Sequence, residues 1–293
     1  MNLRLPLLLL LLPVTALAQP SATMRSALLE SLDVEISSSS EENIQQGGAA
    51  LGTVSVLSTA LSLTGRHSLD ATTMLSYGFA YRRHDLDATT SLLPDQLAEL
   101  TLNLGLQRRF SAQWSGAIFA RPGLYGDFED LGTRSLNLPV LALFNYTRSP
   151  ELVWNFGLNL NAFSDNPVLP IAGLRWRFAP DWTFVVGFPQ SGFSWRHNET
   201  LTLRAGVGFN GGSFRVTESL GSPGPGRARL ANTYLDFREV RVGLGADVSL
   251  GGGFKLVADL GAVTDRKFDY FDRDYRIDGD AGLYGTLALQ ARF

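Results

Sequence analysis

Residues 281–293 read AGLYGTLALQARF, and nearly every second residue of this stretch is apolar. Leu283, Leu287 and Leu289 fall on one side of an extended chain, and Gln290 falls on the other. A period of two is typical of a β-strand with one apolar face and one polar face. The stretch therefore predicts a strand that separates an apolar environment from a polar one.

The stretch ends on an aromatic residue, Phe293. Such an end is favourable when the strand faces lipid, its edges are paired and the aromatic ring lies at the membrane interface. The stretch resembles the closing strand of bacterial outer-membrane β-barrels, although it has Ala291 where an aromatic residue is common in those barrels. The resemblance implies that Phe293 is an assembly signal, read by the outer-membrane assembly machinery.

The start of the chain predicts export. A short basic start is followed by an unbroken apolar run at 5–12, and Ala16 and Ala18 form an A-x-A cleavage pattern. The run is too short to cross a membrane as a helix and is typical of a secretory signal. We expect a signal peptide at 1–18, a periplasmic lead-in at 19–30 and one β-barrel domain at 31–293.

The composition agrees with an exported strand protein. The chain has no Cys, which suits passage through an oxidising periplasm and leaves no thiolate ligand for a metal. The hydrophobic content is 45%, yet after the signal no apolar run approaches the length of a membrane helix. The formal net charge of −3 gives no reason to expect nucleic acid binding. We expect no cofactor and no metal.

Alternating segments predict an all-β antiparallel barrel, with 14 strands, or 12 if the two weak N-terminal strands are lost or merged. The alternation slips near Val56, which a β-bulge would explain. Pro139 interrupts another strand and predicts a bulge or a bend. The predicted strands lie at 32–37, 51–63, 72–81, 99–107, 114–123, 136–146, 152–162, 172–178, 182–188, 201–210, 214–217, 231–250, 254–262 and 281–293.

The predicted connections alternate between short and long. Short ones lie near residues 111, 149, 180, 211 and 252, and long ones near 90, 130, 166, 194, 225 and 272. Outer-membrane barrels have short periplasmic turns and longer extracellular loops. Four Trp residues lie beside predicted short turns on apolar faces, which predicts a girdle at the periplasmic interface; they are Trp114, Trp154, Trp176 and Trp182.

The segment 167–196, PVLPIAGLRWRFAPDWTFVVGFPQSGFSWR, carries a Leu-Pro before a strand with Gly and Trp, then a Pro-Asp-Trp turn and a strand that ends in Pro. Together with GGSFRV at 211–216 it resembles a family of Gram-negative outer-membrane β-barrel proteins with a domain of unknown function. The resemblance implies the fold and the outer-membrane location, and it implies no activity.

Charged residues recur on the polar faces of the predicted strands. They could form a pore lining whose opposed charges orient solutes, or a paired network that fills and stiffens the lumen. Barrels are filled at about 8 strands and open at about 16–18, so 14 strands leave both alternatives open. The candidate pore-lining residues are Glu99, Arg121, Arg175, Arg177, Arg204, Arg241, Asp247, Lys255 and Asp259.

The sequence does not favour an enzyme. The three histidines, His67, His84 and His197, all fall in predicted turns or loops, whereas a Ser–His site on the barrel wall needs a His on a strand. The acidic stretch 265–280 lacks the ligand and Gly positions of an EF-hand loop, and its basic residues compensate its charge. We expect no catalytic residue and interpret this stretch as a solvated extracellular loop or one that touches lipopolysaccharide.

These observations predict a barrel in the outer membrane of a Gram-negative bacterium. We expect a passive channel or transporter for small molecules, and the alternative is a structural or surface-interaction barrel with a closed lumen. The expected partners are the lipid bilayer, lipopolysaccharide, the outer-membrane assembly machinery and periplasmic chaperones.

Overall fold

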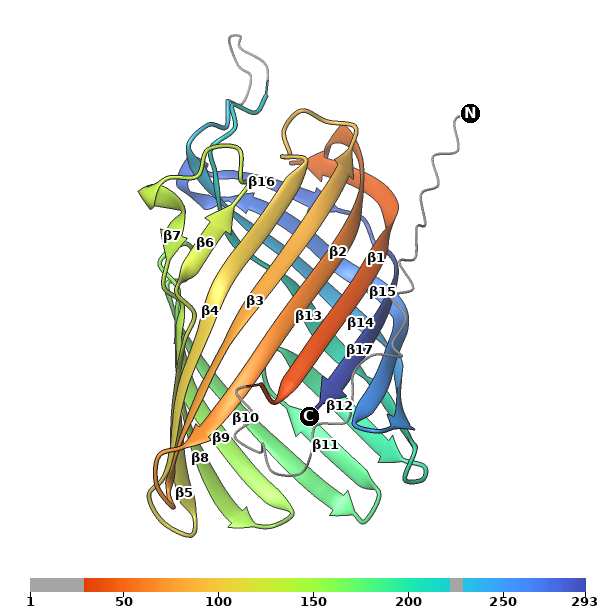
Figure 1. Ribbon diagram of the computed structural model, residues 1–293. Helices are drawn as coiled ribbons and strands as arrows, with labels where there is room; N and C mark the ends of the chain where they lie inside the picture. Colours follow the sequence, from red (N-terminus) through yellow and green to blue (C-terminus); the bar gives the residue numbers. More distant parts are fainter. Residues whose placement is uncertain (1–28, 222–228) are drawn as a thin grey trace.

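The computed structural model describes residues 29–221 and 229–293, which form one closed antiparallel barrel (Figure 1). Closure comes from the pairing of the last strand, β17 (Gly282–Arg292), with the first, β1 (Ser31–Gln46), where Leu289 lies opposite Val34. The predicted signal peptide and most of the predicted lead-in lie outside the described residues. No helix among the described residues is long and apolar enough to cross a membrane.

The 17 strand segments form a wall of 14 strands, as predicted. The two numbers differ because three wall strands are each split into two segments. Pro122 separates β5 from β6, and Pro139 separates β7 from β8, which confirms the predicted interruption at Pro139. The remaining bounds are β2 (Ala49–Ser68), β3 (Thr73–Ala88), β4 (Gln96–Arg109), β5 (Trp114–Ala120), β6 (Gly123–Gly126), β7 (Leu136–Asn137), β8 (Val140–Ser149), β9 (Leu152–Leu160), β10 (Val168–Ala179), β11 (Trp182–Val186), β12 (Gln190–Arg196), β13 (Leu201–Val216), β14 (Thr233–Gly251), β15 (Phe254–Tyr270) and β16 (Tyr275–Gly279).

Two predicted connections, the long one near residue 194 and the short one near residue 211, are wrong, and the two errors cancel in the strand count. β12 occupies the region near residue 194 where a long loop is predicted. β13 runs straight through Gly211, where a turn is predicted. Gly211 has φ +128, and a Cβ there would collide with the carbonyl oxygen of Phe237, so the glycine allows close strand pairing and marks no reversal.

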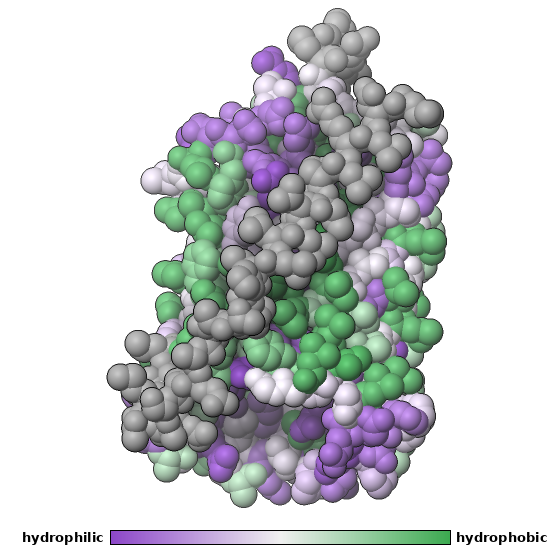
Figure 2. All heavy atoms as spheres, turned by 45° about the vertical axis from the view of Figure 1, so that its right-hand side comes forward, coloured by the Kyte–Doolittle hydropathy of each residue, from purple (hydrophilic) through white to green (hydrophobic). Residues whose placement is uncertain are grey.

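The half of the barrel nearest the short turns carries large apolar side chains on its outer face (Figure 2). Leu244, Leu260 and Leu283, on neighbouring strands, are 69%, 71% and 70% exposed. Such a continuous apolar surface is unfavourable in water and is favourable against lipid hydrocarbon. The barrel is therefore a transmembrane barrel, and we call this surface the lipid belt.

Aromatic residues border the lipid belt at the end with the short turns. The four predicted girdle residues are partly or fully exposed on the outer face. Trp195, predicted to lie in a loop, joins them because β12 places its ring against Trp182 at a centroid distance of 5.7 Å. The girdle therefore contains all five Trp residues of the chain.

Towards the other end, which carries the longer loops, the polarity of the two faces is inverted. Along β14 the inward residues change from Arg241 to Phe237 and Leu235, both buried, whereas the outward residues change from Val242 to Arg238. The slip in alternation near Val56 is not caused by a bulge on β2, whose register with β3 is regular. It is caused by the same inversion, because Val56 is buried and faces inward, whereas the leucines of β2 closer to the short turns face outward. The nearby irregularity lies on β1.

Inward-facing apolar side chains fill the barrel at this end, and we call them the seal. The strands that carry them continue into stretches predicted as loops, namely 38–48, 84–96 and 265–280. These strand extensions were missed because their inner face is as apolar as the outer face of the lipid belt. The buried members are Ile44, Val54, Val56, Leu86, Leu93, Leu97, Tyr125, Phe163, Phe214, Val216, Leu220, Leu230, Leu235, Phe237, Phe268, Tyr270 and Ile277.

Opposite walls of the barrel also touch across the seal. Gly126 at the end of β6 pairs in parallel with Arg215 of β13. The next residue, Asp127, accepts hydrogen bonds from the backbone N–H groups of Thr217 and Glu218 at 2.6 and 2.9 Å and from the Thr217 hydroxyl at 2.8 Å. Burial, followed by neighbouring carboxylates, raises the pKa of Glu218. This contact, the clasp, holds the end of the barrel shut.

Candidate functional site

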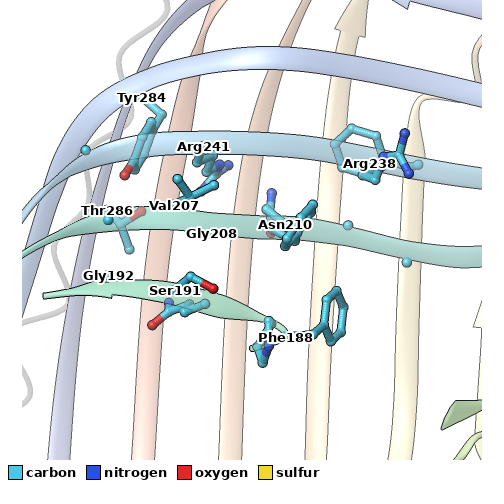
Figure 3. Close-up of a pocket in the computed structure, with 18 of the residues that line it drawn as sticks. Phe188, Ser191, Gly192, Val207, Gly208, Asn210, Arg238, Arg241, Tyr284 and Thr286 are labelled. Atoms are coloured by element: carbon cyan, nitrogen blue, oxygen red, sulfur yellow. The ribbon is translucent and has the colours of Figure 1, made fainter. Parts of the chain in front are cut away.

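Below the seal lies a cavity of about 1040 Å³ that occupies the lumen and extends through the wall to outward-facing residues such as Arg238. Glycines at inward positions of β12, β13 and β14 place no side chain in the lumen and so leave this space open. Figure 3 shows Arg241, Tyr284 and Thr286 grouped on one side, and Phe188 in the turn just before β12; all four line the cavity. The charged residues that line the lumen part are Glu35, Arg82, Arg121, Arg204, Arg241 and Asp259.

One wall of the cavity carries a three-strand ion network. Arg204 on β13 donates to Asp247 on β14 at 2.9 Å and to Asp259 on β15 at 3.1 Å. Lys255 donates to Asp247 at 3.2 Å. A Cβ at Gly245 would meet Asp259 and Arg204, so this glycine makes room for the network. The Arg204 side chain is 26% exposed, so its charge acts on the open lumen.

A second group of charged side chains lies on the part of the wall formed by strands β3, β4, β5 and β6. Arg121, in the break between β5 and β6, donates to Glu99 at 2.8 Å. Arg82 of β3 is opposite Glu99 in the strand register and lines the same cavity. Within the described residues Arg82 makes no ion pair. Charged groups thus face the lumen from two separate parts of the wall, and each group contains both positive and negative side chains.

A buried ion cluster separates the cavity from the seal. Glu239 has 0% side-chain exposure and accepts from Arg241 at 2.6 Å and from Arg266 at 3.0 Å. Ser39 and Asn210 also donate to this carboxylate. The cluster joins β1, β13, β14 and β15 directly beneath the apolar side chains, so it forms a polar floor to the seal.

The cavity also reaches the outer surface through a gap in the wall. The β11–β12 hairpin is short and turns at residues 187–189. As a result, β10 pairs with β11 only from Leu174 onward, and β13 pairs with β12 only as far as Gly208. The facing edges of β10 (168–173) and β13 (209–214) therefore have no strand between them. We call this gap the side window.

The β9–β10 loop closes the upper side of the window. Asn161 donates to the Ser213 hydroxyl at 3.3 Å, and the backbone N–H of Asp165 donates to Asp236 at 2.9 Å. Pro170 lies on the open edge of β10, where the N–H that proline lacks is not needed for pairing. The cavity lining includes residues from every side of the window: Asn161, Asp165, Leu169, Phe188, Pro189, Gln190, Phe209 and Ser213.

The predicted pore-lining residues fall into three groups. Arg121, Arg204, Arg241 and Asp259 line the cavity. Glu99, Asp247 and Lys255 form ion pairs with members of that group or with each other. Arg175 and Arg177 do not line it, and Arg177 lies 3.8 Å from Glu151 near a short turn. Phe293 is 61% exposed, and its N–H donates to the carbonyl oxygen of Glu30.

Four charged residues of the lumen and its floor are absent from the predicted pore lining. Glu239 has the same inward position along β14 as Arg241, so extending the alternation by two residues would have found it. Arg82 lies just beyond a predicted strand end, and Arg266 lies in a predicted loop. Glu35 was within a predicted strand but was not selected. Two of these omissions, Arg82 and Arg266, arise because their strands are longer than predicted, whereas Glu239 and Glu35 lie within predicted strands.

The prediction that all three histidines lie in turns or loops is wrong. His67 lies on β2 and His84 on β3. His84 Nδ1 lies 2.7 Å from the Ser58 hydroxyl, but the ring is fully buried against Phe214 and Phe237. Its Nε2 has no hydrogen-bond partner among the described residues. The pair lies inside the seal, where a substrate has no access. In the described part of the chain, no cluster of His and acidic residues is suited to a metal.

Comparisons with solved structures found barrels of similar size. The outer membrane channel COG4313 from Pseudomonas putida F1 is 11% identical, with a TM-score of 0.49, and the match covers 94% of this chain and 100% of that one. A FadL homologue from Pseudomonas aeruginosa is 10% identical, with a TM-score of 0.44 and 90% of each chain covered. The toluene transporter TbuX from Ralstonia pickettii is 8% identical, with a TM-score of 0.41 and 90% of each chain covered.

A comparison with curated proteins found no match. A comparison with family models found one that matches residues 52–276, and this family is described as a domain of unknown function, DUF6268.

Proposed function

The chain belongs to the DUF6268 family, and we propose that it is a passive conduit for small molecules in the outer membrane of a Gram-negative bacterium. The observation that supports this proposal is the charged cavity, which together with its opening through the wall measures about 1040 Å³, in a barrel whose membrane-facing surface is apolar. A barrel that serves only as a scaffold has no need of an open, charged interior.

The size and lining of the cavity favour small polar or amphipathic solutes. Its volume is at the upper end of the roughly 300–1,000 Å³ of small-molecule sites. The ion network around Arg204 lies on one part of the wall, and the pair of Arg121 with Glu99 lies on another. Opposed charges of this kind orient a dipolar solute while water keeps the walls hydrated.

The outer-membrane location is part of the proposal. The lipid belt, the Trp girdle and the short turns at one end match the pattern in which short turns face the periplasm and longer loops face outward. This orientation would place the seal on the outer side, near lipopolysaccharide. It would also place Phe293 in the periplasm, where chaperones and the assembly machinery would meet it first.

The alternative is a barrel with a closed lumen and a structural or surface-interaction role. The seal and the clasp favour this alternative, because they block the barrel along its axis. The two functions differ in one measurable property, since only a conduit passes ions and solutes.

The test is to reconstitute the purified barrel in planar bilayers and in liposomes. We expect stepwise conductance in KCl and liposome swelling in arabinose. Arg204→Gln should shift the reversal potential towards cation selectivity, because it removes a positive charge and leaves Asp247 and Asp259 in place. The control is Arg66→Gln, which alters an exposed surface pair. If the native protein shows no conductance and no swelling, the conduit is excluded and the closed barrel remains.

A further inference from the structure

We infer that the side window is the outer mouth of the conduit, so that small amphipathic solutes enter sideways at the membrane–water boundary and not along the barrel axis. This inference rests on the proposed conduit function. It follows from the obstruction of the axis, the height of the window, the chemistry of its rim and the space behind it.

The axial path is obstructed by packed side chains. Phe214, Phe237, Phe268 and Tyr270 are at most 2% exposed inside the seal, and the Phe237 and Phe268 rings stack at 5.0 Å. The Tyr270 hydroxyl donates to the carbonyl oxygen of Leu92 at 2.7 Å, which ties β15 to the β3–β4 loop. Close-packed cores of this kind contain few voids as large as a water molecule. A solute moving along the axis would have to unpack this core.

The window lies where the outer face changes from apolar to polar. In the register of β13 with β14, Phe209 is opposite Val240, and both side chains point outward. One outward position further along β14 is Arg238, which is exposed. The hairpin tip at Pro189 accepts a hydrogen bond from the N–H of Phe209, so the lower edge of the window is at this boundary. The opening therefore begins at the upper limit of the lipid belt.

The two edges of the window have different chemistry. The lower edge is aromatic, because the Phe188 and Phe209 rings lie 5.4 Å apart and are 54% and 41% exposed. The upper edge is polar, with the carboxylates of Asp165 and Asp236 beside the β9–β10 loop. A solute with an apolar ring or short chain and a polar group can contact both edges at once. This pairing defines the expected class of solute.

Four glycines contribute to the wall behind the window. Gly192, Gly206, Gly208 and Gly243 line the passage between the window and the lumen. At Gly208 the nearest heavy atom to an added Cβ is the Gln190 Cγ, at 3.6 Å, and φ is not positive. There is therefore room for a larger side chain at residue 208, which would project into the passage. This position gives a direct way to block the window.

The first test uses Gly208→Trp, with Gly132→Trp as the matched control. Gly132 is in an exposed loop, and an added Cβ there meets nothing within 4 Å. We expect Gly208→Trp to abolish most of the KCl conductance and the liposome swelling in arabinose and in phenylalanine. The control variant should retain both. Heat-modifiable migration on a gel will show whether each variant is a folded barrel.

A second test blocks the window after folding. The native chain has no Cys, so a single introduced thiol is the only target of a thiol reagent. Gln190→Cys in a bilayer is measured before and after a bulky methanethiosulfonate reagent is added on the long-loop side. We expect the reagent to remove most of the conductance of Gln190→Cys and to leave that of Gly132→Cys unchanged.

The outcomes separate this inference from the proposed function. If the native barrel conducts and the reagent does not reduce the conductance of Gln190→Cys, the mouth is elsewhere and the side-window route is wrong, whereas the conduit stands. If the native barrel passes neither ions nor solutes, both proposals fail. Loss of flux in Gly208→Trp and after labelling of Gln190→Cys supports both.

Discussion

At the scale of single residues, the most consequential group is the Glu239 carboxylate. It is fully buried and lies against Arg241 and Arg266, whose side chains are 10% and 0% exposed. Two guanidinium groups in a low-dielectric site are tolerated because this acid and the surrounding hydroxyl groups compensate them. The alternation of the sequence indicates Arg241 as a lumen residue but not its partners, because Glu239 precedes the clearest part of the alternation in the predicted strand 231–250 and Arg266 lies beyond the predicted end of its strand.

We expect Glu239→Gln to destabilise the barrel by about 3–5 kcal/mol, because it leaves two buried guanidinium groups without a counter-charge. Glu30→Gln, which alters the exposed pair with Arg66, should cost no more than about 1 kcal/mol. Urea unfolding in lipid vesicles, followed by Trp fluorescence, measures both changes. Equal stability losses in the two variants would show that the buried cluster has no special role.

At the scale of elements, the clasp depends on a strand of four residues, β6, that reaches across the barrel. Its pairing with β13 is possible because β12 extends along β13 only as far as Gly208 and leaves the edge of β13 beyond that residue without a neighbour. One short hairpin therefore has two effects, since it opens the side window and frees the edge that the clasp uses.

Asp127→Ala should loosen the clasp, because three donors of Thr217 and Glu218 lose their acceptor, each at a cost of about 1–3 kcal/mol if it stays unsatisfied. We expect faster hydrogen exchange at the amides of Thr217 and Glu218, with protection of the lipid-belt strands unchanged. Asp87→Ala, at an exposed site of β3 with no hydrogen bond to its carboxylate in the described residues, is the control. Unchanged exchange at both amides would show that the clasp does not depend on Asp127.

The sequence predicted the elements in the lipid belt well and those near the seal poorly. β9 was clear because one of its faces is apolar along its whole length. β3 was cut short because its inward face becomes apolar at Leu86, so a simple alternation no longer marks inside and outside. β12 was missed because Pro189 and Gly192 are typical of a loop. The side window could not be predicted, since it depends on where neighbouring strands end relative to each other.

At the scale of the whole molecule, the barrel has two parts that obey opposite rules. Next to the short turns, polar groups face inward and apolar groups face lipid, and next to the longer loops this order is reversed. The first part is organised like a membrane pore and the second like the core of a water-soluble domain. This arrangement explains how one barrel can be hydrated inside at one end and dry inside at the other.

The five Trp residues all belong to one girdle, so the native fluorescence should report a single depth in the bilayer. Lipids brominated near the head group should quench this fluorescence more strongly than lipids brominated near the end of the acyl chain, because Trp prefers the interface. Trp182→Phe should lower the total emission without changing the ratio of the two quenching efficiencies. Stronger quenching by the deep bromines would contradict the assigned position of the girdle.

The reversal of polarity also sets the mutational tolerance of the chain. At Leu244, an introduced Lys would have to enter hydrocarbon, at a cost of about 2–4 kcal/mol near the bilayer centre. At Arg238, three outward positions further along the same strand and the same face, the native residue is already a cation and is exposed. Outward positions of one strand should therefore exclude charged residues near the short turns and accept them near the longer loops. A method that predicts the effects of substitutions from one rule for the whole strand will be wrong for half of its positions.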